Sequence, residues 1–267
     1  MSVLDMNNFN FLQKYQRLQH TIMYDELIDL GFTVVGYSKT DSYAFWNLAL
    51  TNVNLSENQI FEIEDVLRRC QRDSTIYFEN KNQLKELKEV LGKNGYKKNF
   101  EDCWQFWAGG KKPESRYFNS AKKVTDIATL KIFLEAFNRC YQKNDPQNPY
   151  GELGSDYLKV SAEVWRRHSQ SERIEYFMIY KNNQPVAVST LTNHDGIGYI
   201  SNVGSLRDVR GEGYGKAATL FCIQESIRRG NNEHCLATEE GAYPNEFYKR
   251  IGFETRFTAV GYTKILK

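Results

Sequence analysis

The alternation of apolar and polar positions is clearest in the second half of the chain. Apolar residues recur every three or four positions after Asp126, which predicts a helix that begins at this N-cap and runs to about Tyr141. The polar segment Asn144–Pro149 contains two prolines and ends that helix. A second helix is expected over roughly Ser155–His168.

Three strands are expected after these helices, at Glu175–Tyr180, Val186–Thr192 and Gly198–Val203. The dipeptides Asn182-Asn183 and Asp195-Gly196 between them are typical of tight hairpin turns. The pattern therefore predicts an antiparallel meander.

The remainder of this half alternates between helix and strand. A helix is expected from Gly213 to Arg229, where Gly230 ends it, and a strand at His234–Thr238 follows. A short helix over Asn245–Arg250 then leads into a final strand from Phe253. Strands that alternate with helices in this way indicate an α/β (α+β) fold.

The first half predicts a smaller α/β domain. Two amphipathic helices, Asn58–Arg72 and Lys81–Lys93, flank a strand at Thr75–Phe78, and a further strand, Tyr96–Trp107, follows Asn94-Gly95. This helix–glycine–aromatic–strand ending resembles the end of the second half. The similarity predicts that the first half is a degenerate copy of the same unit.

A change of composition separates the halves. Gly109-Gly110 and Pro113 stand among charged residues, as in a linker, and follow an aromatic run that ends at Trp107. The sequence therefore predicts an N-terminal domain over 1–110 and a second domain over 115–267.

Composition narrows the class of protein. The chain is 41% hydrophobic and 25% charged with a net charge of +2, which gives no reason to expect binding to nucleic acid or to a membrane. No run of 18 apolar residues occurs, and residues 1–14 lack the pattern of a signal peptide, so a cytoplasmic location is expected. The five cysteines are widely spaced, which favours free thiols over disulfides or a metal site.

The most specific motif is the segment Val209–Ala217, between a strand and a helix. Its glycines alternate at Gly211, Gly213 and Gly215, which lets the backbone approach a ligand closely and direct several N–H groups at it. The N-terminus of a helix adds a favourable dipole, and Arg210 and Lys216 add positive charge. The segment therefore predicts a site for a phosphate or pyrophosphate.

Two common phosphate motifs fit this segment poorly. The Walker A pattern fails because three residues rather than four separate Gly211 from Gly215, and because Ala217 replaces the hydroxyl residue. Gly213–Ala218 does match the dinucleotide pattern G-x-G-x-x-A. However, the first glycine does not directly follow the strand, and too few residues remain after Glu240 to complete a dinucleotide-binding fold.

A third pattern accounts for more of the chain. Arg210–Gly215 matches the motif [RQ]-x-x-G-x-[GA] of the GNAT superfamily of N-acetyltransferases, and Phe247–Phe253 resembles the family's F-Y-x-x-x-G-F segment. Arg207, where the family usually has proline, and Gly241, where it often has asparagine, depart from the pattern. The resemblance covers about residues 121–267. It implies a mixed, mostly antiparallel, splayed sheet flanked by helices.

The resemblance also implies acetyl-CoA as co-substrate, with no metal. Pantetheine would lie between the splayed strands and pair with backbone groups near Val203 and Ser205. The pyrophosphate would rest on the N–H groups of the glycine loop. The implied cofactor-binding residues are Val203, Ser205, Arg210, Gly211, Gly213, Tyr214, Gly215 and Lys216.

The catalytic groups are only partly indicated. Tyr248 corresponds to the family's tyrosine that serves the leaving sulfur, although a core aromatic is the alternative interpretation. The base that takes the proton from the attacking amine stays open: Glu175, Glu239, Glu240 and a water chain are the candidates. His194 beside Asp195 lies in a predicted hairpin turn, where a surface role is favoured.

The sequence thus predicts an N-acetyltransferase that moves an acetyl group from acetyl-CoA to an amine of a small molecule or peptide. The alternative is an acyl-CoA-binding regulatory or interaction module without turnover. The first half has no glycine loop, so it is expected to act as a lid, a docking surface or a homodimer element that shapes the acceptor pocket.

Overall fold

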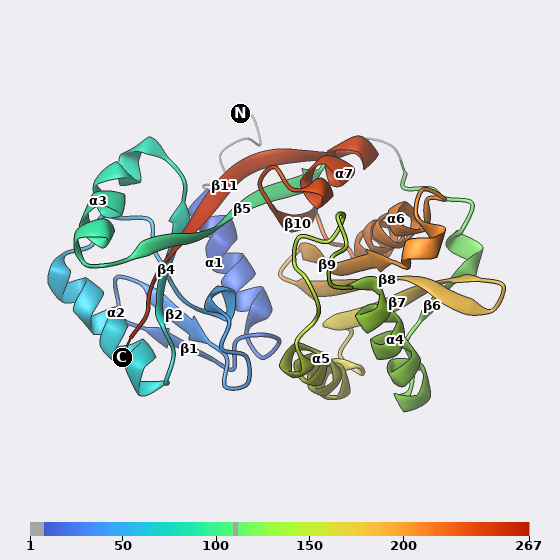
Figure 1. Ribbon diagram of the computed structural model, residues 1–267, viewed down its shortest axis with the longest axis horizontal. Helices are drawn as coiled ribbons and strands as arrows, with labels where there is room; N and C mark the ends of the chain where they lie inside the picture. The colour runs from blue at the N-terminus through green and yellow to red at the C-terminus, as the bar shows by residue number, and fades with distance from the viewer. Residues whose placement is uncertain (1–7, 109–111, 267) are drawn as a thin grey trace. The chain divides into compact units, whose positions relative to one another are not determined.

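The computed structural model of the protein describes residues 8–108 and 112–266, in two compact units (Figure 1). Unit 1 comprises the chain up to Trp104 together with the segment from Arg256, and unit 2 comprises Gln105–Thr255. The linker residues Gly109 and Gly110, with Lys111, lie outside the described residues, and the predicted division at 110–115 stays a prediction.

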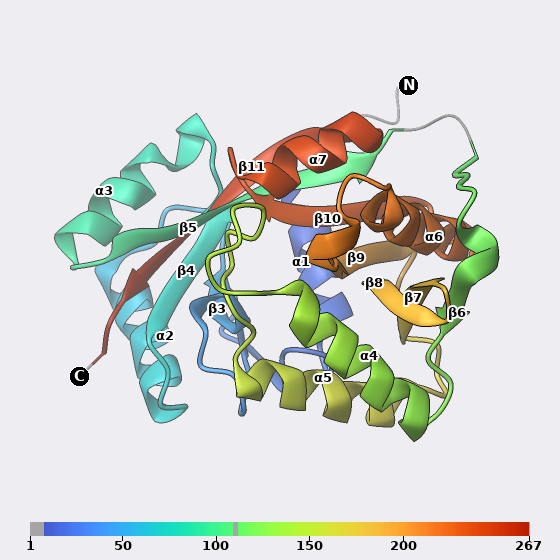
Figure 2. The same cartoon turned by 45° about the vertical axis from the view of Figure 1, so that its right-hand side comes forward.

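Unit 2 contains the predicted series of helices and strands and one further strand, β6, all labelled in Figure 2. Its elements are β6 (Ala121–Lys123), α4 (Ile127–Cys140), α5 (Ser155–His168), β7 (Ile174–Lys181), β8 (Gln184–His194), β9 (Ile197–Ser205), α6 (Tyr214–Arg228), β10 (Glu233–Glu239) and α7 (Tyr243–Ile251). The ends of β5 (Lys97–Trp107) and β11 (Phe253–Lys264) complete it. The strand order is β6-β7-β8-β9-β10-β5.

Local sequence explains why these elements form. The side chain of Asp126 accepts from the backbone N–H of Thr129 at 2.7 Å, which caps α4 as predicted. The turn residues Asn183 and Gly196 both have positive φ, and β7, β8 and β9 pair antiparallel through the hairpins they close. The meander is therefore confirmed, together with the mixed, mostly antiparallel sheet.

The sheet of unit 2 opens between β9 and β10. Parallel pairing joins Ile197–Tyr199 to Glu233–Cys235 and stops there, although both described strands continue. On β9, Asn202 has φ +52° and interrupts the regular register with β8. Its amide is held by a hydrogen bond from the Tyr157 hydroxyl at 2.8 Å. The second half of β9 thus leaves one edge free of β10.

Unit 1 repeats the topology of unit 2. Its elements are α1 (Asn8–Gln19), β1 (Glu26–Asp29), β2 (Val34–Tyr37), β3 (Asn47–Leu50), α2 (Glu57–Arg69), β4 (Ser74–Glu79), α3 (Lys85–Lys93), β5 and the outer part of β11. β1, β2 and β3 pair antiparallel, and β3 pairs parallel with β4 across α2, as β7 to β10 do across α6. The repeated sequence ending thus coincides with a repeated order of strands and helices, and the origin of the first half as a degenerate copy of the second stays a prediction.

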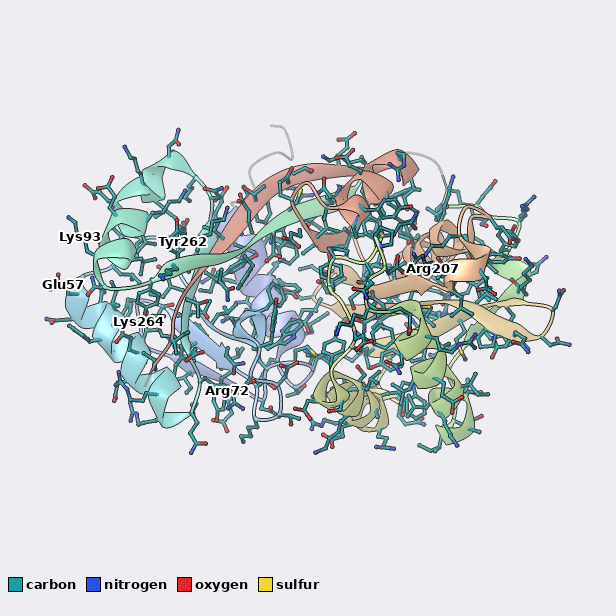
Figure 3. All side chains as sticks on the ribbon, in the orientation of Figure 1. Glu57, Arg72, Lys93, Arg207, Tyr262 and Lys264 are labelled. Carbon is teal, nitrogen blue, oxygen red and sulfur yellow. The ribbon has the colours of Figure 1, made fainter. Side chains whose placement is uncertain are left out.

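The last strand completes the sheet of unit 1. Residues 259–264 of β11 pair antiparallel with β4, and the order is β1-β2-β3-β4-β11-β5. Lys264, labelled in Figure 3, forms an ion pair with the buried carboxylate of Glu64 on α2 at 2.8 Å. Throughout residues 8–108 and 112–266, no helix combines the length and the apolar content needed to cross a membrane.

Candidate functional site

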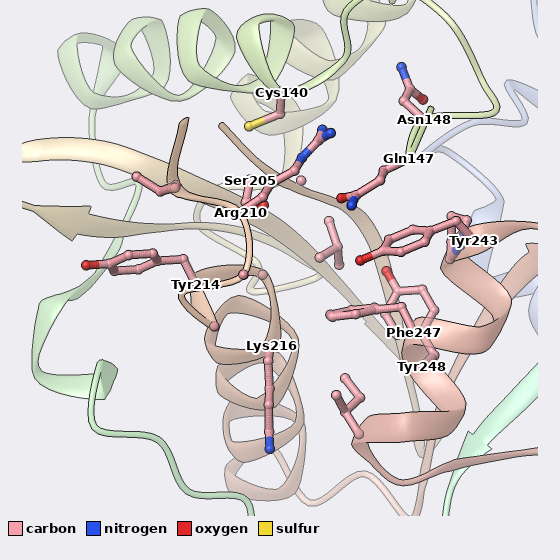
Figure 4. A pocket seen from close by; sticks show the side chains of 18 of the residues that line it. Cys140, Gln147, Asn148, Ser205, Arg210, Tyr214, Lys216, Tyr243, Phe247 and Tyr248 are labelled. Carbon is pink, nitrogen blue, oxygen red and sulfur yellow. The ribbon is translucent and has the colours of Figure 1, made fainter. Parts of the chain in front are cut away.

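A pocket of about 360 Å³ lies in unit 2 at the point where β9 leaves β10. The end of β9, the start of α6, the helix α7 and the segment after α4 form its walls (Figure 4). All of the predicted site residues line it, from one continuous loop and two further elements. They are Val203, Ser205, Arg210, Gly211, Gly213, Tyr214, Gly215, Lys216 and Tyr248.

The glycine loop has a backbone conformation that is unfavourable for residues other than glycine. Gly211 has φ +81° and Gly213 has φ +94°, both in the left-handed region. Gly213 is also the N-cap of α6, and it has no side chain to accept hydrogen bonds from the first turn.

The first turn of α6 consequently presents unused donors. Among the described residues, none supplies an acceptor to the backbone N–H groups of Tyr214, Gly215 and Lys216; the first bond of the helix is donated by Ala217 to the Gly213 carbonyl. These donors point along the helix axis, where the dipole favours negative charge. The loop is therefore suited to an anion such as a pyrophosphate.

The glycine loop is braced from outside the pocket by Tyr117. The Tyr117 hydroxyl donates to the carbonyl of Glu212 at 3.1 Å, and its ring stacks on Tyr214 with centroids 4.3 Å apart. Lys181 neutralises the Glu212 carboxylate at 2.8 Å. Three contacts thus fix the part of the loop that precedes α6, and no sequence motif indicated Tyr117.

A buried ion pair joins the loop to the segment that follows α4. Arg210 contacts Asp145 at 2.5 Å, and the Asp145 side chain is only 1% exposed. The guanidinium of Arg210 holds the pKa of the Asp145 carboxyl below its usual value. The backbone N–H of Gln147 donates to the same carboxylate oxygen at 3.0 Å. Asp145 therefore positions the segment that brings Gln147 and Asn148 to the pocket.

The wall formed by β9 is packed closely against α4. A Cβ at Gly204 would lie 2.6 Å from the Cβ of Cys140, so only glycine fits there. The Tyr141 hydroxyl donates to the Val203 carbonyl at 3.1 Å. This bond occupies one of the two lone pairs of the carbonyl oxygen. Ser205 contributes to the same wall.

Tyr248 lies on α7, between the pocket and the core. Its ring packs edge-on against Phe247 and Phe253, with centroids 5.1 and 5.6 Å away. Burial raises the pKa of the Tyr248 phenol above the ordinary value. Figure 4 shows Tyr243, Phe247 and Tyr248 projecting from α7 toward the pocket. Tyr248 therefore both lines the pocket and belongs to the hydrophobic core, which are the two positions that the sequence left open.

The carboxylates considered as bases lie elsewhere. Glu175 is fully buried and bonds to Arg229 at 2.5 Å and to Lys123 at 2.7 Å, which makes it part of a structural ion-pair network. Glu239 and Glu240 are exposed and do not belong to the pocket lining. In the described part of the chain, no group of three His, Cys, Asp or Glu side chains is placed to hold a metal ion.

Comparison with known proteins identifies the fold around the pocket. A solved GCN5-related N-acetyltransferase from Kribbella flavida is similar to the chain with a TM-score of 0.68 and 17% identity, covering 100% of this chain and 97% of that one. A GCN5-related N-acetyltransferase from Sphaerobacter thermophilus has a TM-score of 0.58 and 13% identity, covering 89% and 82%. A tandem GNAT protein from the clavulanic acid biosynthesis pathway has a TM-score of 0.54 and 10% identity, covering 87% and 78%.

These likenesses concern the fold, and the last fits the repeated topology of two units. None of the curated proteins compared with the chain matches it. The family model for the acetyltransferase (GNAT) family matches residues 130–253, which include β9, the glycine loop, α6 and α7. The segment that forms the pocket is therefore the part of the chain that is similar to the acetyltransferase (GNAT) family.

Proposed function

We propose that the protein transfers the acetyl group of acetyl-CoA to a primary amine of a small molecule or peptide. The observation that carries this proposal is the uncapped start of α6 beside the opening between β9 and β10. An anion-binding helix end next to an unpaired strand edge suits a ligand with a pyrophosphate and an amide-containing arm.

The described residues fit the parts of acetyl-CoA in turn. The N–H groups of Tyr214, Gly215 and Lys216 would bind the pyrophosphate, and the exposed residue Lys216 adds a positive charge to the first turn of the same helix. The backbone of Val203 and Ser205 would pair with the pantetheine amides. Arg210, already paired with Asp145, would hold the loop in place rather than bind phosphate through its side chain.

Acetyl-CoA supplies an acyl thioester, and the residues of the pocket would assist the transfer of its acetyl group from sulfur to nitrogen. The amine nitrogen forms a bond to the acyl carbon while the carbon–sulfur bond breaks, and the sulfur leaves as a thiolate that needs a proton. Tyr248 would donate a hydrogen bond and then a proton to that sulfur. Its raised pKa keeps the phenol protonated at neutral and mildly alkaline pH, so the donor is present wherever the amine is reactive.

A matched pair of variants tests the binding site. Gly213→Asp places a carboxylate at the proposed phosphate site, whereas Gly213→Asn has the same shape and left-handed strain without the charge. By calorimetry, the Asp variant of the full chain should bind CoA at least about tenfold more weakly than the Asn variant, since like charges repel at short range. Equal affinities would move the phosphate site elsewhere.

A second measurement separates the enzyme from a binding module. Thiol release from acetyl-CoA is followed with a panel of primary amines, and release that depends on the amine is the expected result. If the protein binds acetyl-CoA and no amine in the panel increases thiol release, the alternative of an acyl-CoA-binding regulatory module is favoured.

A further inference from the structure

The pocket lining lacks a group that can accept a proton from an ammonium ion. Among the described residues that form it, none is an aspartate, a glutamate or a histidine. Asp145 is buried outside the lining and pairs with Arg210 through Oδ1, and Glu175 pairs with Arg229 and Lys123. An attacking amine must have an unshared electron pair, so its protonation state has to be settled by some other means.

The phenols of the lining are proton donors rather than acceptors. Burial raises the pKa of Tyr141 and Tyr248, and also that of Tyr214, whose ring is covered by Tyr117. Tyr150 and Tyr243 line the pocket with side chains that are 51% and 42% exposed. Each of these two side chains carries an O–H group that can donate a hydrogen bond.

The thiol and the cations of the lining cannot take the proton either. Burial raises the pKa of the Cys140 thiol on α4 to about 12. Arg210, Lys216 at the start of α6 and Arg250 on α7 are positively charged groups without a free lone pair. Arg210 is neutralised by Asp145, and the two remaining cations of the lining, with no unpaired anion among its described residues, disfavour the entry of a further positive charge.

We propose that the acceptor is a weakly basic primary amine that enters the pocket already unprotonated, such as a peptide α-amine or an aromatic amine, rather than a lysine ε-amine. This inference rests on the proposed acetyl transfer. The shared chemistry of the two acceptor types is a nitrogen lone pair that is available at neutral pH. The proton released when nitrogen bonds to the acyl carbon then leaves with water.

The expected selectivity follows from the acceptors themselves. A lysine ε-amine has a pKa near 10.4 and an α-amine one of about 7.7 to 8.0, so at pH 7 the unprotonated fraction of the α-amine is larger by roughly 300-fold. The greater intrinsic nucleophilicity of the ε-amine offsets part of this advantage. We expect kcat/KM at pH 7 to favour the α-amine by at least about tenfold.

The test compares two forms of one acceptor. Lysine amide acetylated at Nε offers only the α-amine, lysine amide acetylated at Nα offers only the ε-amine, and aniline represents the aromatic class. CoA release by the full-length protein is measured for each between pH 6 and pH 10. We expect the α-amine and aniline to react at pH 7. The inflection of the kcat/KM profile should follow the pKa of the amine for the two lysine derivatives, and aniline, which is unprotonated throughout this range, should show no inflection of its own.

Two results would overturn the inference in distinguishable ways. An inflection at one pH for all three acceptors would reveal a base on the protein, reached directly or through water, while leaving the acetyl transfer intact. A preference for the ε-amine at pH 7 would have the same meaning. Absence of CoA release with every acceptor at every pH would instead overturn the proposed function, and this inference with it.

Discussion

Replacing Tyr117 with alanine should weaken the binding of CoA, although Tyr117 is not one of the residues that line the pocket. Tyr117 fixes the glycine loop through a hydrogen bond to the Glu212 carbonyl and a stacked contact with Tyr214. A ring pair contributes about 0.5 to 1.5 kcal/mol and a hydrogen bond about as much again. Because this hydrogen bond is exposed to solvent, the lower part of the sum, about 1 to 2 kcal/mol, applies. If that energy orders the loop, affinity for CoA falls by about 5- to 30-fold.

The assay for this positioning role is calorimetry with CoA, followed by steady-state kinetics with acetyl-CoA. Tyr117→Phe is the matched control, since it keeps the ring and removes only the hydroxyl, so it should lie between the parent and the alanine variant. We expect KM for acetyl-CoA to rise while kcat changes little, because the loop does not touch the reacting atoms. A CoA affinity equal to that of the parent would refute the reasoning, as would a fall in melting temperature that accounts for the whole effect.

Three further predictions concern single side chains. Tyr248→Phe keeps the ring that packs on Phe253 and removes the proposed proton donor, so turnover should fall by about 10²-fold in steady-state assays while acetyl-CoA affinity and melting temperature hold. Asp145→Asn should lower the free energy of unfolding by about 1.5 to 3 kcal/mol in urea titrations at pH 7, because it weakens a charged hydrogen bond to Arg210. Folding lowers the pKa of Asp145. The difference in unfolding free energy between the parent and the Asn variant should therefore be complete at pH values above the ordinary pKa near 3.8, and it should shrink as the pH falls through the lower pKa of the folded state. Ser56→Ala should cost about 1 kcal/mol through loss of the α2 cap, with CoA affinity unchanged.

The predictability of the fold differs between the halves for a physical reason. In unit 2, caps and turns such as Asp126 and Gly196 are encoded by neighbouring residues, and the predicted helix over Ser155–His168 has the observed bounds. In unit 1, α1 buries Gln16 and Gln19 on its packed face, which conceals its apolar period. The strands β1, β2 and β3 have four residues each, too few for an alternation to show. The pairing of β11 with β4 joins residues far apart in the sequence, and no local pattern specifies it.

The same distinction applies to the site. The glycine loop could be predicted because its residues are contiguous and each has a local conformational reason, as the positive φ of Gly211 and Gly213 shows. Asp145 and Tyr117 were missed because they reach the loop from 65 and 95 positions away, to Arg210 and Glu212. Their residue types carry no signal until the fold brings them there. The sequence likewise could not show that the pocket lining contains no carboxylate among the described residues, because the fold decides which side chains reach the pocket.

The repeated topology of the two units allows a direct comparison of two helix N-termini. Both α2 and α6 follow a strand and connect it to a parallel neighbour. At α2, Ser56 accepts from the backbone N–H of Gln59 at 3.4 Å, and the Gln59 side chain accepts from the Ser56 N–H at 2.9 Å. At α6, the corresponding cap is Gly213, which leaves the first turn without an internal acceptor. In a helix that caps itself, the side chain already occupies N–H donors that a phosphate would need. The difference between Ser56 and Gly213 at the N-cap therefore gives a physical reason for proposing a single CoA site, in unit 2.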